Sequence, residues 1–425
     1  MKVLHGTLLQ PENAESCNVL PDTTVRIDDD GRIAEVGTER KASGDVVGGQ
    51  GYWIIPGFVD AHLHLPQWDR RGIDGLSLFE WREKVVFPAE ARFADPDVAE
   101  KLAEDFVSGV ISRGTTAVAS YGSPFATATE RVFSVLARRG IRAVHGQTLN
   151  DTNCPDQLTG PTDKLLDESR NLAAKWNNAE DGRLHYAFSP REPLYCSEKL
   201  MRGAAALASM LKCHIQTHAG ESLHEVNAVR ERFPENYDDV NLFAELGMLT
   251  NRTLLGHGVV LDQSERHHLA ETGTTLVHCP TANLFLESGL MDYVAHRRAG
   301  VRFALGSSVA SGPDPFMPRV AVEFLQTAKA LKVHAIPRRS DALPTPAEAW
   351  WLLTTGAAEA LSLGDRVGKI AKGYEADCLV IRPEAWINEL PAEQQASALL
   401  YTLRPDQIEH VFIAGRRVGP QLGDV

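Results

Sequence analysis

The chain has 425 residues, of which 43% are hydrophobic and 23% are charged. This is an ordinary globular composition, which excludes a disordered, collagen-like or coiled-coil chain, and the length suits several domains or one large barrel with an appendage. The 56 acidic residues outnumber the 43 basic ones and give a formal net charge of −13, so we do not expect nucleic acid as a partner. No apolar stretch approaches the roughly 20 residues that a membrane span needs, and no secretory signal is visible. We therefore expect a cytoplasmic protein whose six scattered cysteines stay reduced.

Both ends of the chain are rich in short strand candidates. Five segments have this character: residues 24–27, 32–36, 376–381, 411–413 and 416–418. The pair Asp30-Gly31 separates the first two, and an Asp-Gly pair favours a tight hairpin turn. We expect residues 1–55 and 366–425 to build one small composite β-sandwich domain together.

The middle of the chain alternates strands and helices. Eight apolar segments have the character of buried parallel strands: residues 53–60, 115–121, 142–149, 184–190, 213–218, 253–260, 274–279 and 302–306. Between them, residues 95–113 carry a helical apolar stripe, and the segment from Thr345 to Glu348 predicts the capped start of a helix that runs to about residue 363. The pattern predicts an α/β fold in which residues 56–365 form a TIM-like (β/α)8 barrel. Reacting groups of such barrels lie at the C-terminal ends of the strands.

Histidines stand at the ends of four predicted strands. His62 and His64 end the first strand, where alternate side chains share a face and both can point into the barrel mouth. His218, His257 and His278 end the fifth, sixth and seventh strands. One His-x-His pair also fits surface decoration, and one later histidine fits a core residue. The whole set predicts a metal site, because imidazole is the commonest ligand of zinc-like ions and three or four such ligands leave room for a reactive water.

An acidic residue follows this predicted site. Glu221 lies three residues after His218, just past the predicted strand end. A carboxylate there can reach over the metal and move protons between a water and a substrate nitrogen. Glu221 also fits the first turn of a helix, where the helix dipole favours an acidic residue, and the two interpretations are compatible.

These motifs resemble those of the amidohydrolase superfamily. The matching segments are residues 56–64 (Pro-Gly-Phe-Val-Asp-Ala-His-Leu-His), 218–221, 256–258, 278–283 and 368–377. Within the superfamily the chain is similar to the guanine deaminases, in the branch of purine and triazine aminohydrolases. This closer resemblance depends on five shorter segments in the same order: residues 66–68, 79–81, 87–90, 149–152 and 189–191.

The resemblance implies a bound metal, zinc or another divalent transition metal such as Fe²⁺, with four ligands: His62, His64, His218 and His257. It implies Glu221 as the proton shuttle and His278 as a residue that orients the reacting water. Gln67 and Arg191 would hold the purine edge, since an amide and a guanidinium fork suit a carbonyl and ring nitrogens. Without the resemblance these two would be interpreted as a surface residue and a structural ion-pair partner.

Two positions depart from the family pattern. Guanine deaminases end the eighth strand with an aspartate that ligates the metal and takes a proton from its water. Here Ser308 occupies that position, and a serine neither ionises near neutral pH nor serves as an anionic ligand. Asp314 could replace the aspartate only if its loop folds inward. Glu192 stands where those enzymes tend to carry Phe, and it would alter the pocket or pair with Arg191 and weaken its grip.

We therefore expect a hydrolase that converts guanine and water to xanthine and ammonia, with an activity that Ser308 lowers. Two alternatives stay open: an enzyme that takes an amine or chloride from a pterin, an oxidised purine or a triazine, and a non-catalytic relative that binds a purine or serves as an assembly subunit. Ser308 favours the non-catalytic relative, whereas the retained Glu221, His278, Gln67 and Arg191 favour the enzyme. The expected partner is a small heterocyclic substrate, not nucleic acid or a membrane, and the resemblance suggests a homodimer.

Overall fold

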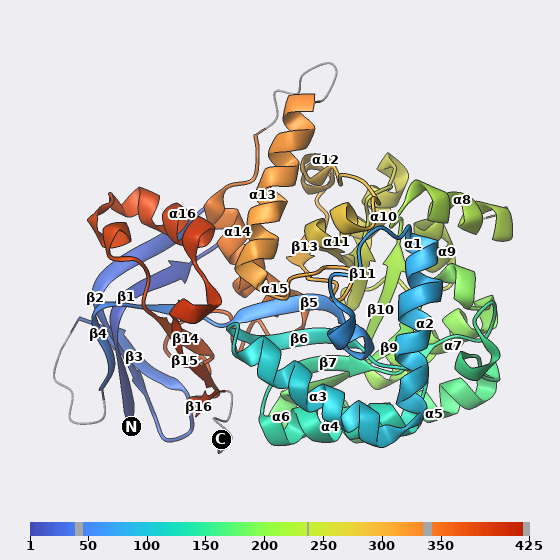
Figure 1. Cartoon of the computed structure of the whole chain (residues 1–425), viewed down its shortest axis with the longest axis horizontal. Coiled ribbons are helices and arrows are strands. Elements are labelled where there is room, and N and C mark those ends of the chain that lie inside the picture. The colour runs from blue at the N-terminus through green and yellow to red at the C-terminus, as the bar shows by residue number, and fades with distance from the viewer. Residues whose placement is uncertain (39–45, 236–237, 335–341, 420–425) are drawn as a thin grey trace.

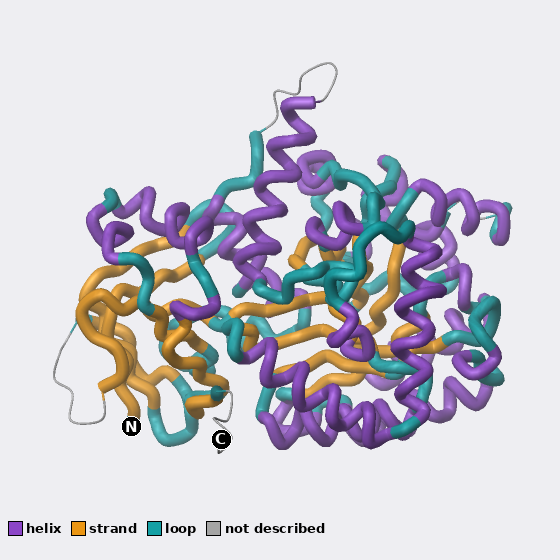
Figure 2. Tube along the Cα trace, viewed as in Figure 1, coloured by secondary structure: helices purple, strands orange, loops and turns teal. Residues whose placement is uncertain are grey.

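The strands of the protein gather in two sheets, one on each side of the molecule (Figures 1 and 2). The structure is a computed structural model that describes residues 1–38, 46–235, 238–334 and 342–419. Most helices surround the larger sheet, while the first and the last described strands of the chain lie in the smaller one (Figure 1).

The larger sheet is a barrel of parallel strands, as predicted. Its described strands follow the order β5-β6-β7-β9-β10-β11-β12-β13, with β8 beside β9. Their bounds are β5 (Phe58–His64), β6 (Thr115–Tyr121), β7 (Arg142–Gly146), β8 (Thr148–Leu149), β9 (Leu184–Pro190), β10 (His214–Ala219), β11 (Thr253–His257), β12 (Thr275–His278) and β13 (Arg302–Leu305). The chain after β13 meets β5, since the Ser308 N–H donates to the carbonyl of His62 and the His64 N–H donates to that of Val309, both at 2.8 Å. The TIM-like barrel is confirmed.

The smaller sheet combines both ends of the chain, which confirms the predicted composite β domain. Its seven described strands follow the order β16-β15-β14-β4-β1-β2-β3. Their bounds are β1 (Lys2–Pro11), β2 (Cys17–Ile27), β3 (Ile33–Gly37), β4 (Val46–Pro56), β14 (Cys378–Ile381), β15 (Ile408–Ile413) and β16 (Arg416–Val418). The predicted hairpin joins β2 to β3, and Gly31 supplies its left-handed turn residue with φ of +81°. The domain bounds drawn from the sequence stay a prediction.

One predicted strand is wrong. The apolar segment 53–60 belongs to two strands, because β4 ends at Pro56 and β5 begins at Phe58. β4 pairs with β1 and β14 in the smaller sheet, whereas β5 pairs with β6 in the barrel. Both strands are buried here and therefore equally apolar, so hydrophobicity alone does not mark where the chain passes from one sheet to the other.

Helices surround the barrel, and α14 and α16 pack against β1 and β2 of the smaller sheet (Figure 1). The described helices are α1 (Leu78–Trp81), α2 (Phe87–Ala91), α3 (Pro96–Ile111), α4 (Ala126–Arg139), α5 (Thr162–Trp176), α6 (Ala179–Gly182), α7 (Glu198–Leu211), α8 (Leu223–Arg232), α9 (Asp239–Glu245), α10 (Gln263–Thr272), α11 (Pro280–Phe285), α12 (Tyr293–Arg298), α13 (Met317–His334), α14 (Pro346–Leu353), α15 (Thr355–Ala360) and α16 (Ala392–Thr402). Among the residues described, none of these helices is long and apolar enough to cross a membrane.

The two helices predicted in detail both form, with one correction. The segment 95–113 is α3, and the Asp95 side chain accepts the N–H of Asp97 to cap it. The helix predicted to run to residue 363 is interrupted at Thr354, which separates α14 from α15. Thr345 accepts the N–H of Glu348 at 3.2 Å, but the Glu348 carboxylate binds Tyr293 and Arg297 instead of returning to the cap.

A buried arginine ties the barrel to the smaller sheet. Arg142 begins β7 and its side chain is fully buried. Its guanidinium donates to both carboxylate oxygens of Asp377, at 2.7 and 2.8 Å, and to Glu375 at 2.7 Å. Both acids immediately precede β14, so the ion pair joins the first half of the barrel to the strand that returns into the smaller sheet.

We expect Arg142→Met to lower the free energy of unfolding by ~3–5 kcal/mol, because the buried carboxylate of Asp377 loses its arginine partner, whereas Glu375 keeps Arg366. The matched control is Arg138→Met, since Arg138 pairs with Glu100 and Glu104 on the surface, where such a pair contributes ~0–1 kcal/mol. Chemical denaturation followed by circular dichroism measures both. Equal losses in the two variants would contradict this role for Arg142.

Candidate active site

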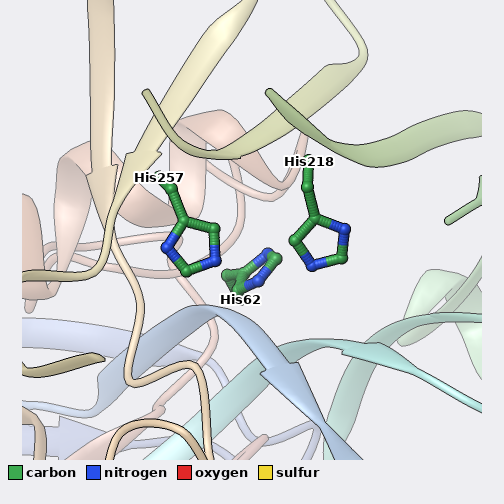
Figure 3. Close-up of side chains that lie close together, drawn as sticks. All are labelled: His62, His218 and His257. Atoms are coloured by element: carbon green, nitrogen blue, oxygen red, sulfur yellow. The ribbon is translucent and has the colours of Figure 1, made fainter. Parts of the chain in front are cut away.

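Three of the predicted ligands converge at the mouth of the barrel (Figure 3). His62 ends β5, His218 lies near the end of β10, and His257 ends β11. Their ligand nitrogens all lie within 4.8 Å of one another, and all three residues are buried. The parallel strands place these residues together because their C-terminal ends meet at one face of the barrel.

The fourth predicted ligand, His64, adjoins these three residues, and the four together form the histidine cluster. The Nε2 atom of His64 lies 3.2 Å from Nε2 of His218, close to the ~3.3 Å expected between two imidazole nitrogens on one tetrahedral zinc ion. The ring of Tyr121, at the end of β6, stacks on both imidazoles at centroid distances of 4.7 and 4.9 Å. Nε2 of His62 is buried and has no hydrogen-bond partner in the described part of the chain. This set of nitrogen donors fits a divalent cation.

Hydrogen bonds behind two of the rings determine which nitrogen faces the cluster. Nδ1 of His218 lies 2.8 Å from the carbonyl oxygen of Arg191 and 3.3 Å from a carboxylate oxygen of Glu192. Nδ1 of His257 lies 2.8 Å from the side-chain oxygen of Asn283. These oxygens accept hydrogen bonds, so each Nδ1 carries the proton and each Nε2 keeps a lone pair for a metal.

Burial keeps most of the cluster neutral. Loss of hydration, together with repulsion from neighbouring histidines, lowers the pKa of His62 and of His64 well below the usual value. Burial also lowers the pKa of His257. The pKa of His218 is raised instead, because the Glu192 carboxylate outweighs the effect of burial. Neutral imidazole is the form that binds metals, so three of the four rings are already in that form.

Glu221 lies beside the cluster, next to the end of β10. Its Oε1 atom is 3.4 Å from Nε2 of His257, and its Oε2 atom is 3.1 Å from the guanidinium of Arg82. A guanidinium only donates, so Oε2 accepts from Arg82 and Oε1 is left to exchange a proton in the cavity.

Arg82 is a site residue that sequence reasoning missed. It opens a turn of π-helix (Arg82–Val86), and its buried guanidinium meets Glu192 and Glu221 at 3.1 Å and Glu225 at 2.6 Å. These carboxylates raise the pKa of Arg82 even though burial opposes the charge. In return Arg82 and His218 outweigh the effect of burial and lower the pKa of Glu192 to about 2. All three acids lie on other elements, so no local spacing pointed to Arg82.

The two predicted substrate-binding residues also face this region. Gln67 lies in a short helical turn (Leu65–Arg70) directly after β5. Arg191 follows β9, and its guanidinium donates to Asn150 at 3.0 Å and to Glu90. A guanidinium has five N–H donors, so these two partners leave donors for a ligand. The acidic partner of Arg191 is thus Glu90, and the pairing of Arg191 with Glu192 that the sequence suggested is not observed, since Glu192 pairs with Arg82.

Most of the predicted site residues line one cavity at the barrel mouth. The predicted residues among its lining are His64, Gln67, Arg191, His218, Glu221, His257 and Ser308. Arg82 and Glu192 add charge to its wall, and the apolar part of the wall consists of Leu78, Trp81, Val86 and Leu286. His62 lies behind this lining, within the histidine cluster. A polar interior with one apolar wall suits a small planar heterocycle.

Two further predicted residues lie apart from the cavity. His278 ends β12, but its ring packs against Phe324 at a centroid distance of 5.9 Å, and burial lowers its pKa to about 3. Its role in orienting the reacting water stays a prediction. Asp314 accepts the N–H of Phe316 at 2.9 Å, and its side chain is 42% exposed. It therefore does not supply the carboxylate that Ser308 lacks.

Comparisons with known proteins identify the family of the chain. A sequence model of the amidohydrolase family matches residues 53–418. A probable guanine deaminase from Deinococcus radiodurans is 30% identical over 98% of each chain. The crystal structure of a guanine deaminase from C. acetobutylicum, with guanine bound in its active site, is 25% identical with a TM-score of 0.92 and covers 98% of this chain and 99% of that one. An adenosine deaminase from Xanthomonas campestris with bound zinc is 26% identical with a TM-score of 0.85, covering 100% and 94%.

We expect the purified protein to bind about one zinc ion per chain and His62→Ala to lose it on dialysis, because a ligand on β5 is removed. Elemental analysis gives the metal content. His296→Ala is the control, since His296 is buried on α12 and bonds to the backbone of Asp292. Full zinc content in His62→Ala would contradict the assignment of the histidine cluster as a metal site.

Proposed function

Because the chain belongs to the amidohydrolase family, we propose that it is a metal-dependent deaminase that hydrolyses guanine to xanthine and ammonia. The observation that carries this proposal is the convergence of the histidine cluster, Glu221 and the pair Gln67 and Arg191 around one cavity. The relative from D. radiodurans and the guanine-bound structure from C. acetobutylicum support guanine as the substrate. The homodimer and the cytoplasmic location stay predictions.

The metal we propose is zinc, held by residues of the cluster: His62, His64, His218 and His257. Lone pairs on neutral imidazoles suit zinc, and the surrounding charge favours a dication. Two of the carboxylates that contact Arg82, Glu192 and Glu221, each place an oxygen within 3.4 Å of a cluster histidine, so negative charge lies next to the cluster. When bound, such an ion supplies the Lewis acidity that makes a water nucleophilic near neutral pH.

Glu221 moves the protons in this proposal. Its Oε1 atom faces His257 and is the oxygen not held by Arg82. There it accepts a proton from the attacking water and passes it to a ring nitrogen. It then takes the proton of the new hydroxyl group and gives it to the amine, so that a carbonyl forms, the bond to nitrogen breaks and ammonia leaves. Gln67 and Arg191 orient the ring, because an amide and a guanidinium donate to the carbonyl and ring nitrogens of guanine. Glu90 and Asn150 hold the Arg191 side chain in place.

Ammonia release from guanine by the zinc-loaded protein tests this function, and we expect Glu221→Gln to lower turnover by ~10²–10⁴-fold, the usual contribution of general acid–base transfer. Zinc content should stay at the wild-type level, because the substitution keeps all four imidazoles. A Gln variant that turns over guanine at the normal rate would show that the protons take another route.

Ser308→Asp should raise both zinc affinity and turnover. Position 308 lines the cavity next to His62, and its φ of +48° lies in the left-handed region where aspartate is enriched, so the backbone accepts the change. The new carboxylate is both an anionic ligand and a base, and we expect a gain of at least ~10-fold in zinc affinity. Ser308→Asn is the control of equal size without charge.

The outcome also separates the enzyme from the alternative functions. Full zinc occupancy in Ser308→Asp without ammonia release from guanine, pterins or triazines would favour the non-catalytic relative. Ammonia or chloride release from a pterin or triazine, but not from guanine, would instead identify a deaminase or chlorohydrolase of another heterocycle.

A further inference from the structure

We propose that Glu192 strengthens metal binding through its contact with His218. Its carboxylate, which lies behind the His218 ring, supplies the negative charge that is missing in the cavity because position 308 is serine. The inference depends on the proposed metal site and deepens it. It concerns a residue at which this chain departs from the family pattern, and it assigns that residue a positioning role.

The contact with the ligand ring is direct. Oε2 of Glu192 lies 3.3 Å from Nδ1 of His218, on the side of the ring opposite the Nε2 atom that faces His64. Both side chains are buried, with exposed fractions of 2% and 5%. Water therefore screens the carboxylate from the imidazole only weakly.

Arg82 fixes the other end of the carboxylate. Oε1 of Glu192 lies 3.1 Å from the guanidinium, which Glu221 and Glu225 also contact. Each oxygen of Glu192 thus has a separate role, since one faces the buried cation and the other faces the ligand histidine. A buried carboxylate without such a cation would protonate or turn away, so Arg82 holds Glu192 in the form and position that the contact requires.

Glu192 affects the His218 ring through its charge rather than through a hydrogen bond. The backbone carbonyl of Arg191 already accepts from the same Nδ1 at 2.8 Å, and this bond alone fixes the tautomer. The carboxylate adds negative charge, which raises the basicity of the nitrogen that faces the metal. Partners of this kind behind a metal-bound histidine typically contribute ~10–100-fold to metal affinity.

Zinc affinity of the full chain, measured by competition with a chelator of known affinity, tests the proposal. We expect Glu192→Gln to bind zinc ~10–100-fold more weakly than wild type, and the matched control Glu225→Gln to stay within about threefold. Glu225 is an equally buried carboxylate on the same guanidinium, 2.6 Å from Arg82, and no contact joins it to an imidazole in the described structure. Equal affinities in the two variants, whether weakened or not, would overturn the proposal.

The visible spectrum of the Co²⁺-loaded protein gives a second readout. The bands should shift in Glu192→Gln and not in Glu225→Gln, because only the first changes the donor strength of a ligand. If Glu192→Gln does not fold, Glu192→Asp and Glu192→Asn replace it. These two have the same size and differ in charge, so Glu192→Asp should bind zinc more tightly, and equal affinities would overturn the proposal.

Two more variants complete the test. Ser308→Asp added to Glu192→Gln should recover at least ~10-fold in zinc affinity, because a charge is restored next to the ion. No recovery would overturn the compensation between the two positions. Unchanged zinc binding in His62→Ala, or none in the wild type, would overturn the metal site of the proposed function itself, and the present inference with it.

Discussion

The candidate site depends on the closure of the barrel between β5 and the segment that follows β13. Two backbone hydrogen bonds join them, from Ser308 to His62 and from His64 to Val309, so the closing contacts involve two of the predicted ligands. Asp60 strengthens the same junction, since its carboxylate accepts both the N–H and the hydroxyl of Ser307. Burial of this carboxylate raises the pKa of Asp60 to about 7. The histidines of β5 meet those of β10 and β11 only because this junction closes the ring of strands.

Closure also encloses charge, which explains the arrangement around Arg82. Ionised groups that leave water need partners, and a buried guanidinium is stable only with well-placed carboxylates. Arg82 has three, and two of them, Glu192 and Glu221, each extend the second oxygen toward a histidine of the cluster. Glu192 and Glu221 therefore connect the ion-pair network to the histidine cluster. A cation among the histidines would balance the negative charge that these two carboxylates place beside it.

The sequence predicted the parts of this site that depend on the strands. Histidines at strand ends converge in any parallel barrel, so His62, His218 and His257 could be placed together before the structure was known. The same logic placed His278 at the end of β12, but its ring packs against Phe324 and is not in the cavity lining, so its role stays a prediction. Arg82 could not be found, since its partners come from distant elements. The break at residue 57 was missed because strands of both sheets are equally apolar where they are buried.

The two carboxylates in the cavity lining, Glu192 and Glu221, have different partners and so suit different roles. Both oxygens of Glu192 are committed, one to Arg82 and one to His218, so this residue holds charge in place and does not carry protons. Glu221 commits only Oε2 to Arg82. With Ser308 after the end of β13, the described lining has no other carboxylate, so in the proposed reaction Oε1 of Glu221 takes the proton from water and delivers it to the substrate. In that reaction one oxygen serves every proton transfer, and the role proposed for Glu192 supplies from behind His218 the charge that an aspartate at position 308 would have supplied within the cavity.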